Sequence, residues 1–239
     1  MSLNFIVILL LSIAFPLLLL WYINGKNRKP ISIKEYVVAV LVGLVVDGTC
    51  LLIEKCVFDV YIFTSIPKSL LECFIASFFR NAFVEEIFKL LGFSALFLLM
   101  KNKQVSVFLL YAIGLAAGFS MLENVVNVTL ASTQVNSIVA FSLGRIVSVF
   151  LHVALSVISA FFITKYWFKN RVLCIACAFL VPYIIHGAHD MIVSTQYYLS
   201  YGAGVILLCL LIFDAISFFA AYKLFCKTII NDTLLIDKQ

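Results

Sequence analysis

Long apolar segments, each about as long as a helix that crosses a lipid bilayer, recur along most of this chain of 239 residues. A transmembrane helix needs roughly 20 consecutive apolar residues, because it rises only ~1.5 Å per residue and must cross ~30 Å of hydrocarbon. The segments that approach or exceed this length are residues 3–23, 36–54, 69–100, 104–130, 137–164, 172–195 and 202–222. The sequence therefore predicts an all-α, polytopic transmembrane helix bundle of about seven spans.

The composition agrees with this fold class. Hydrophobic residues make up 64% of the chain and charged residues 12%, whereas globular proteins have about 25% charged residues. No segment is long and polar enough to form a soluble domain, so we expect one integral-membrane domain over residues 1–239. Segment 69–100 is longer than one crossing needs. An eighth element arises if this segment is broken by a kink or by an interfacial turn around residues 69–80.

Basic residues follow every second predicted span. Cytoplasmic loops carry an excess of Lys and Arg, so this alternation predicts an N-terminus outside and a C-terminus inside. The net charge of +5 then reflects orientation against the anionic inner leaflet and requires no nucleic-acid partner. The basic residues are Lys26, Arg28, Lys29 and Lys34; Lys101 and Lys103; Lys165, Lys169 and Arg171; and Lys223, Lys227 and Lys238.

Ionisable side chains also occur within the apolar spans, where they are costly. A charged residue at the centre of a membrane helix costs roughly 2.5–3.5 kcal/mol on insertion scales, so a cluster of such residues is a hypothesis of function. The set consists of Asp47, Arg80, Glu85, Glu86, Lys89, Glu123, Arg145, His152, His186, His189, Asp190 and Asp214.

Helical spacing and depth predict that several of these residues meet. Residues three, four and seven positions apart share a helical face, which gives polar stripes on the spans 69–100, 137–164 and 172–195. At ~1.5 Å per residue, Glu85, Glu86, His152 and His186 lie ~20–23 Å from the predicted cytoplasmic ends. Glu123 lies ~30 Å from its own cytoplasmic end, nearer the outer surface. We therefore expect a polar cavity between these spans.

A structural role is the alternative for each of these residues. For Asp47 and Asp214 we favour packing in a crevice, and Arg145 could serve only to neutralise a buried glutamate. For the two adjacent glutamates and the two histidines we favour function. Structural ion pairs do not require two imidazoles at the depth of a glutamate pair.

Four short motifs follow one another on successive spans, and together they resemble the PrsW family of intramembrane proteases. This family is distantly related to the CAAX-processing and bacteriocin-immunity proteases, and the resemblance covers about residues 80–195. Two positions depart from the family pattern, at Val84 and Ser159. The motifs are E-E-x-x-K at Glu85, Glu86 and Lys89; G-F-x-x-x-E-N at Gly118, Phe119, Glu123 and Asn124; an R-then-H span at Arg145 and His152; and H-G-x-x-D at His186, Gly187 and Asp190.

The resemblance implies a multi-pass enzyme of the cell membrane, typical of the bacterial plasma membrane. It implies hydrolysis of a peptide bond in a membrane-anchored protein substrate, such as an anti-sigma factor, by a catalytic core at about residues 69–195. The expected catalytic residues are Glu85, Glu86, Glu123, Asn124, His152, His186 and Asp190, supported by Lys89 and Arg145.

Two mechanisms remain open at this stage. In one, His152, His186 and one carboxylate hold Zn²⁺. Glu86 or its neighbour Glu85 is this carboxylate ligand, and whichever of the two does not bind the ion is the general base. In the other, no metal takes part. A glutamate and His152 then activate water directly, while His186 with Asp190 or Asn124 orients the carbonyl and binds the oxyanion.

Two functions of other classes compete with proteolysis. Carboxylates and imidazoles at membrane depth also form the proton or ion path of a transporter or channel. The chain shows no inverted repeat and no matching pair of spans broken by Gly or Pro, which disfavours this class. The second is an immunity or assembly protein that keeps the fold and acts by binding.

Overall fold

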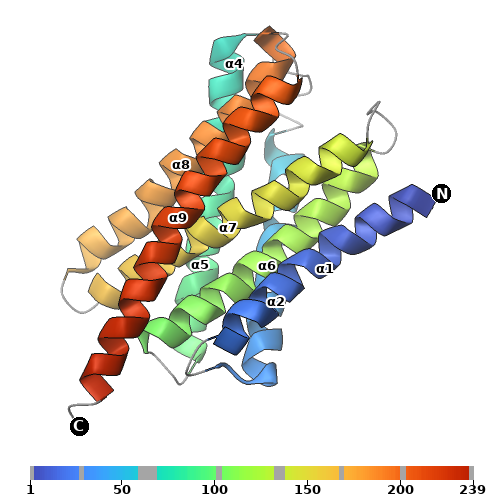
Figure 1. The fold of residues 1–239 in the computed structure, drawn as a ribbon. Coiled ribbons are helices and arrows are strands. Elements are labelled where there is room, and N and C mark those ends of the chain that lie inside the picture. Colours follow the sequence, from blue (N-terminus) through green and yellow to red (C-terminus); the bar gives the residue numbers. More distant parts are fainter. Residues whose placement is uncertain are drawn as a thin grey trace.

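The structure is a computed structural model that describes residues 3–26, 30–58, 69–100, 104–131, 138–166, 170–199 and 203–236. These residues form helices and short connections with no strand among them, which confirms the predicted all-α bundle (Figure 1). The elements are α1 (Leu3–Lys26), α2 (Ile33–Ile53), η1 (Glu54–Phe58), α4 (Leu70–Ile75), η2 (Ala76–Ala82), α5 (Phe83–Leu99), α6 (Val105–Ala131), α7 (Ile138–Tyr166), α8 (Arg171–Leu199) and α9 (Ala203–Ile236).

Five of the described helices are long and apolar enough to cross a membrane on their own. They contain the stretches Ile33–Val57, Val105–Thr129, Arg145–Lys165, Arg171–Ser194 and Leu208–Thr228. The first predicted span lies within α1, and the third is divided between α4, η2 and α5. Helix α1 begins at one end of the bundle and α9 ends at the other (Figure 1). Which end faces the cytoplasm stays a prediction.

Helices α6 and α7 form the interior of the bundle. The protein buries 83% of the apolar stretch of α6 and 72% of that of α7, against 33% for α2, 33% for α8 and 17% for α9. Helix α6 packs against α1, α2 and α7, while α9 packs mainly against α7. The outer helices therefore present their apolar side chains to lipid, and the inner helices can carry polar groups away from it.

Glycines allow α2 and α6 to approach at backbone distance. Gly114 and Gly118 form a G-x-x-x-G pair on α6, a pattern that brings membrane helices together. A Cβ atom added at Gly118 would collide with the carbonyl oxygen of Val40, and one added at Gly43 would collide with that of Leu115. Attraction between lipid-exposed helices depends on such close packing, because lipid tails are as apolar as the side chains.

The N-terminus of α2 is capped and tied to α6. Ser32 accepts a hydrogen bond from the backbone N–H of Glu35, and Glu35 accepts one from the backbone N–H of Ser32 at 2.9 Å. This reciprocal pair satisfies two N–H groups that a helix start leaves without partners. The Tyr111 hydroxyl of α6 donates to the other oxygen of Glu35 at 2.6 Å, so α2 starts at a fixed position against α6.

The long segment 69–100 contains the π-helical stretch η2 in place of a separate interfacial turn. Helices α4 and α5 continue on either side of η2 without a gap, as one rod in Figure 1. A π-helical turn adds residues to the helix without ending it, and such turns are frequent at functional sites. Here η2 ends at Ala82, directly before the turn that carries Glu85 and Glu86.

We expect Gly118→Ala to destabilise the protein by about 1–3 kcal/mol, since the added methyl forces α2 away from α6. Gly48→Ala is the matched control. A Cβ atom there meets only a methyl of Leu122 at 3.6 Å, so this change is neutral or stabilises by up to about 1 kcal/mol. Thermal unfolding of the purified variants measures both effects. Equal melting temperatures for the two variants would contradict the close-packing account.

Candidate active site

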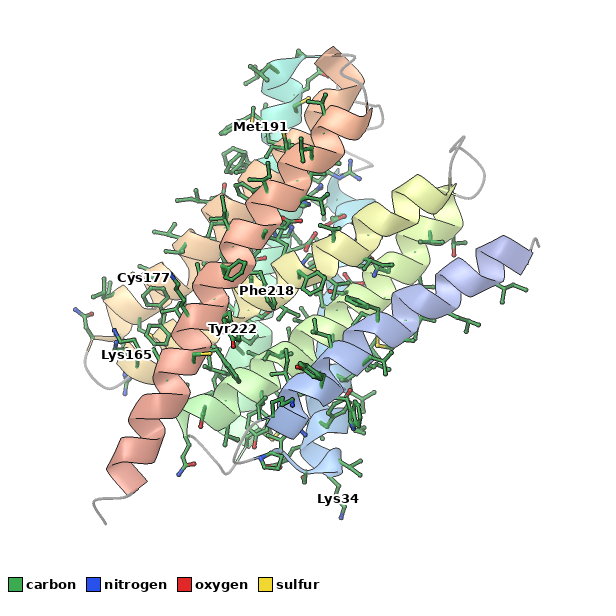
Figure 2. The ribbon with its side chains drawn as sticks, in the orientation of Figure 1. Lys34, Lys165, Cys177, Met191, Phe218 and Tyr222 are labelled. Atoms are coloured by element: carbon green, nitrogen blue, oxygen red, sulfur yellow. The ribbon has the colours of Figure 1, made fainter. Side chains whose placement is uncertain are left out.

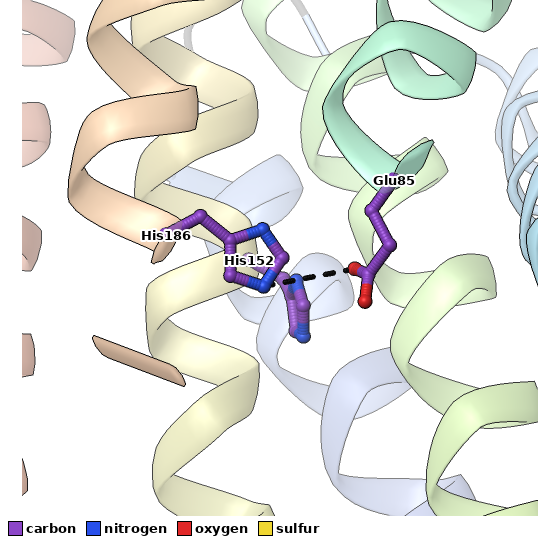
Figure 3. Close-up of side chains that lie close together, drawn as sticks. All are labelled: Glu85, His152 and His186. Carbon is purple, nitrogen blue, oxygen red and sulfur yellow. Dashed lines mark ion pairs between the residues drawn. The ribbon is translucent and has the colours of Figure 1, made fainter. Parts of the chain in front are cut away.

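The site lies where α5, α6, α7 and α8 bring polar side chains into the interior of the bundle. Glu85, Glu86 and Lys89 come from α5, His152 from α7 and His186 from α8. All five are buried, and Lys89 is 0% exposed. Figure 3 shows Glu85, His152 and His186 converging from three separate helices. The predicted meeting of carboxylates and imidazoles is therefore present in the fold.

Lys89 is the centre of this cluster. Its ammonium Nζ lies 3.2 Å from Glu85 Oε2, 2.9 Å from Glu86 Oε1 and 3.1 Å from His152 Nδ1. The same nitrogen lies 4.1 Å from the centroid of the Phe119 ring on α6. Two carboxylates and an aromatic face thus compensate a cation that no solvent reaches.

His186 lies among three carboxylates. Its Nδ1 lies 2.8 Å from Glu86 Oε1, and its Nε2 lies 3.7 Å from Glu85 Oε2 and 3.7 Å from Asp190 Oδ1. The Asp190 side chain is 18% exposed, compared with 10% for that of Glu85 and 2% for that of Glu86. Nε2 therefore faces the more accessible side of the cluster.

His152 links this cluster to a second group of charges on α6 and α7. Its Nε2 lies 2.9 Å from Glu123 Oε2, and the other oxygen of Glu123 lies 2.6 Å from Arg145 Nη2. Arg145 also donates from Nε to Asn124 Oδ1 at 2.9 Å. Arg145 thus neutralises Glu123 and has no ion pair with the glutamates of α5.

Each histidine has a carboxylate on one ring nitrogen and a second nitrogen that faces the interior of the cluster. Glu86 contacts Nδ1 of His186 and leaves Nε2, while Glu123 contacts Nε2 of His152 and leaves Nδ1. Carboxylates in such positions orient the histidine ligands of metal sites and make them more basic. Of these second nitrogens, His186 Nε2 lies near Glu85, whereas His152 Nδ1 lies 3.1 Å from the Lys89 ammonium.

The donor atoms fit a divalent cation. One ligand atom each from Glu85, His152 and His186 lie within 4.8 Å of one another, and two imidazoles with one carboxylate are a donor set of catalytic zinc sites. From sequence, the carboxylate ligand is Glu86 or its neighbour Glu85. The structure groups an atom of Glu85 with the two histidines, while Glu86 contacts Nδ1 of His186.

The surroundings of the cluster are rich in ionisable side chains. Six carboxyl groups and three basic side chains interact in or around it. The carboxylates are Asp47, Glu54, Glu85, Glu86, Glu123 and Asp190, and the cations are Arg80, Lys89 and Arg145.

Two sequence-based expectations differ from the structure. Glu123 contacts His152 directly, although its estimated depth places it nearer the outer surface. The depth estimate measures distance along the axis of each helix. Because α6 runs oblique to α8 (Figure 1), equal distances along the two helices do not correspond to equal depths. His189 does not face the cluster as the polar stripe of α8 predicts. Its Nδ1 lies 2.9 Å from Asp214 Oδ1 on α9.

Asp47 and Glu54 lie closer to the site than sequence reasoning assigns. Asp47 is 1% exposed, and its Oδ2 has no hydrogen-bond partner among the described residues. Its carboxyl interacts electrostatically with Glu123, Glu85 and Lys89, and that of Glu54 with Glu85 and Arg80. The signal was present in the sequence, because positions 47 and 54 are seven residues apart and share a helical face.

The glycine of the H-G-x-x-D motif has a packing role in the structure. A Cβ atom added at Gly187 would collide with the ring of Phe78 in η2. Helix α8 packs closely against η2, so this contact sets the distance between His186 and the turn that carries Glu85.

Comparison with known families agrees with the geometry. The model of the PrsW family of intramembrane metalloproteases matches residues 32–218. The match includes every residue of the site and extends well beyond the motifs at about residues 80–195. No curated protein sequence and no solved structure matches the chain significantly. The chain belongs to the PrsW family of intramembrane metalloproteases.

Proposed function

We propose that this protein is an endopeptidase that cleaves a peptide bond of a membrane-anchored protein, with the cluster around Glu85, His152 and His186 as its active site. The observation that carries the proposal is the convergence of these three ligand atoms within 4.8 Å in the interior of the bundle. The family match supports peptidase chemistry at membrane depth. The catalytic core is about residues 69–195 of one integral-membrane domain, 1–239.

In this proposal Glu85, His152 and His186 would hold Zn²⁺, and the Lys89 ammonium would give up its contact with His152 Nδ1. A bound Zn²⁺ supplies Lewis acidity, which polarises a carbonyl and makes water a stronger acid. Glu86 and Glu123 orient the two imidazoles through the contacts of 2.8 and 2.9 Å. This assignment gives the two adjacent glutamates different roles, one as a ligand and one as the partner of a ligand.

Asp190 is our candidate for proton transfer. Its carboxylate is the most exposed of those around His186 and lies 3.7 Å from Nε2, the nitrogen that faces Glu85. In hydrolysis Asp190 takes a proton from the attacking water and returns it to the amine nitrogen as the C–N bond breaks. Asn124 is the candidate oxyanion donor, because its buried Nδ2 has no partner among the described residues.

The substrate class follows from where the site lies. Its groups are buried between apolar helices, so a peptide bond must reach them from within or beside the bilayer, as an extended segment. We propose a single-span protein with a short unfolded juxtamembrane segment, of the anti-sigma-factor type, in a bacterial plasma membrane. The family resemblance supports this choice.

We expect Asp190→Asn to lower the rate of substrate cleavage by about 10²–10⁴-fold, the usual contribution of a general acid–base group. Membranes from cells that express each variant are compared by mass spectrometry of new peptide termini. His189→Asn is the matched control, since it lies on the same helix and its amide can still bond Asp214. Wild-type cleavage by Asp190→Asn would remove this residue from the mechanism.

Metal binding separates the zinc mechanism from the metal-free one. The purified wild-type chain is expected to contain about one zinc, Glu85→Gln much less, and Asp190→Asn and His189→Asn the wild-type amount. Loss of a ligand removes one of the bonds that hold the ion, whereas the other two side chains are not ligands. Elemental analysis measures the metal. A chelator that strips zinc and leaves cleavage intact would establish the metal-free mechanism.

Lys89→Met is expected to destabilise the zinc-free protein by about 3–5 kcal/mol, because it leaves two buried carboxylates without their cation. Zinc at 100 times its dissociation constant restores about 2.7 kcal/mol. Lys165→Met, at an exposed position, changes stability by less than about 0.5 kcal/mol. Thermal unfolding with and without zinc measures these effects. A Lys89→Met protein insensitive to zinc would argue against a cation site here.

A further inference from the structure

A groove lies between α1 and α9, on the side of α7 that faces away from the active site. It has a volume of about 460 Å³. Val153 and Val157 of α7 and Ile113 of α6 line it, whereas the neighbouring His152 points toward α5 and α8. On α9, Phe218 and Tyr222 lie one turn apart along its other wall (Figure 2). The groove is therefore separate from the catalytic cluster.

Aromatic rings lie at one end of the groove, where Phe218 lines it. Phe150 of α7 makes edge-to-face contacts with Phe218 of α9, at a centroid distance of 5.2 Å, and with Phe15 of α1, at 5.4 Å. The other end is lined by Tyr22, Tyr222 and Lys26, the last residue of α1. From Leu19 to Lys26 the groove follows α1 for ~10 Å at ~1.5 Å per residue. This length is less than half of the ~30 Å hydrocarbon thickness, so the groove lies within one leaflet.

The residues at the open end are those of a membrane interface. Tyrosines and lysines are enriched where hydrocarbon meets the headgroups. Tyr22 and Tyr222 are exposed, and the Lys26 ammonium lies 5.6 Å from the centroid of the Tyr22 ring. Lys223 and Lys227 are also exposed on α9 but do not line the groove, and Lys223 lines a separate depression on that helix. The open end thus combines an apolar lining with the positive charge of Lys26.

We propose that this groove binds one acyl chain of an anionic phospholipid, whose phosphate lies at Lys26. The charge at the open end complements an anionic headgroup, and basic pockets between membrane helices on the cytoplasmic side take such lipids. The predicted orientation places Lys26 at the anionic inner leaflet. From the headgroup at Lys26, the acyl chain runs along the groove toward Phe218.

The lining favours an acyl chain over a helix of another protein or of a second copy. Most of the groove is lined by apolar side chains, and the lining ends at the Lys26 ammonium. A lipid with an apolar tail and an anionic headgroup matches both parts of this lining.

The test uses the full chain, incubated in detergent with equal amounts of phosphatidylglycerol and phosphatidylcholine and examined by native mass spectrometry. We expect the wild type to retain one phosphatidylglycerol in preference to phosphatidylcholine. Lys26→Gln lowers this preference about fivefold, the effect of one lysine near an anionic surface. Lys165→Gln, which removes the same charge from the end of α7 outside the groove, leaves the preference unchanged. An equal loss of the phosphatidylglycerol preference in the two variants would show that surface charge in general causes it. That result would overturn the proposed site.

A second variant tests the groove itself. Ala221 lines it and is 3% exposed, so Ala221→Phe places a ring in the path of the chain and abolishes retention of either lipid. Circular dichroism and the melting temperature report whether this variant folds. If it does not fold, Lys26→Glu replaces it and is expected to reverse the preference toward phosphatidylcholine. The proposal is overturned if a folded Ala221→Phe variant retains as much lipid as the wild type, or if Lys26→Glu leaves the lipid preference unchanged. It is also overturned if the wild-type mass shows a second copy of the protein in place of lipid.

Discussion

The positive charge of Lys89, with no exposed surface at all, is the constraint around which the site is arranged. An ammonium in the interior of a membrane protein is tolerated only when carboxylates compensate it and hydrogen bonds satisfy it. Glu85 and Glu86 supply the charge from the adjacent turn, and His152 supplies an acceptor from α7. Those contacts bring α5 and α7 together at one level, and His186 joins them through Glu86. A second network, from Glu123 to Arg145 and Asn124, continues from His152 along α6 and α7.

Close packing of backbones holds these helices at the distances that the polar contacts require. The glycines of α2 and α6 let one element of the bundle approach another without an intervening side chain. The π-helical stretch η2 then changes the direction in which the following turn presents its side chains. Gly187 allows α8 to lie against η2, so the same contact that packs the helices also positions His186. The chemistry of the site and the stability of the bundle therefore depend on the same interfaces.

The candidate site could be predicted in large part because hydrocarbon makes charged residues conspicuous. Glu85, Glu86, His152 and His186 stand out from apolar spans, and their spacing predicts that they share one cavity. Which of the polar side chains pair with one another could not be predicted in the same way. Arg145 pairs with Glu123 and not with the glutamates of α5, and His189 pairs with Asp214 on α9. Those choices depend on how each helix is rotated and tilted against its neighbours. The sequence predicts a packing role for Asp47, and in the structure its carboxyl also interacts with Glu85 and Glu123 of the site.

By itself, the sequence determined that the chain is a helical membrane bundle, which spans carry polar stripes, and which motifs place it among the PrsW proteases. These properties depend on local composition and helical periodicity, since each helix in a bilayer must satisfy its own backbone hydrogen bonds. Only the tertiary structure decided that ligand atoms of Glu85, His152 and His186 lie within 4.8 Å of one another, and that Glu86 and Glu123 each contact one nitrogen of the two histidines. Adjacent positions on a helix point about 100° apart. Which of them faces a given neighbour is therefore set by interhelical packing, over distances that no local pattern in the sequence records.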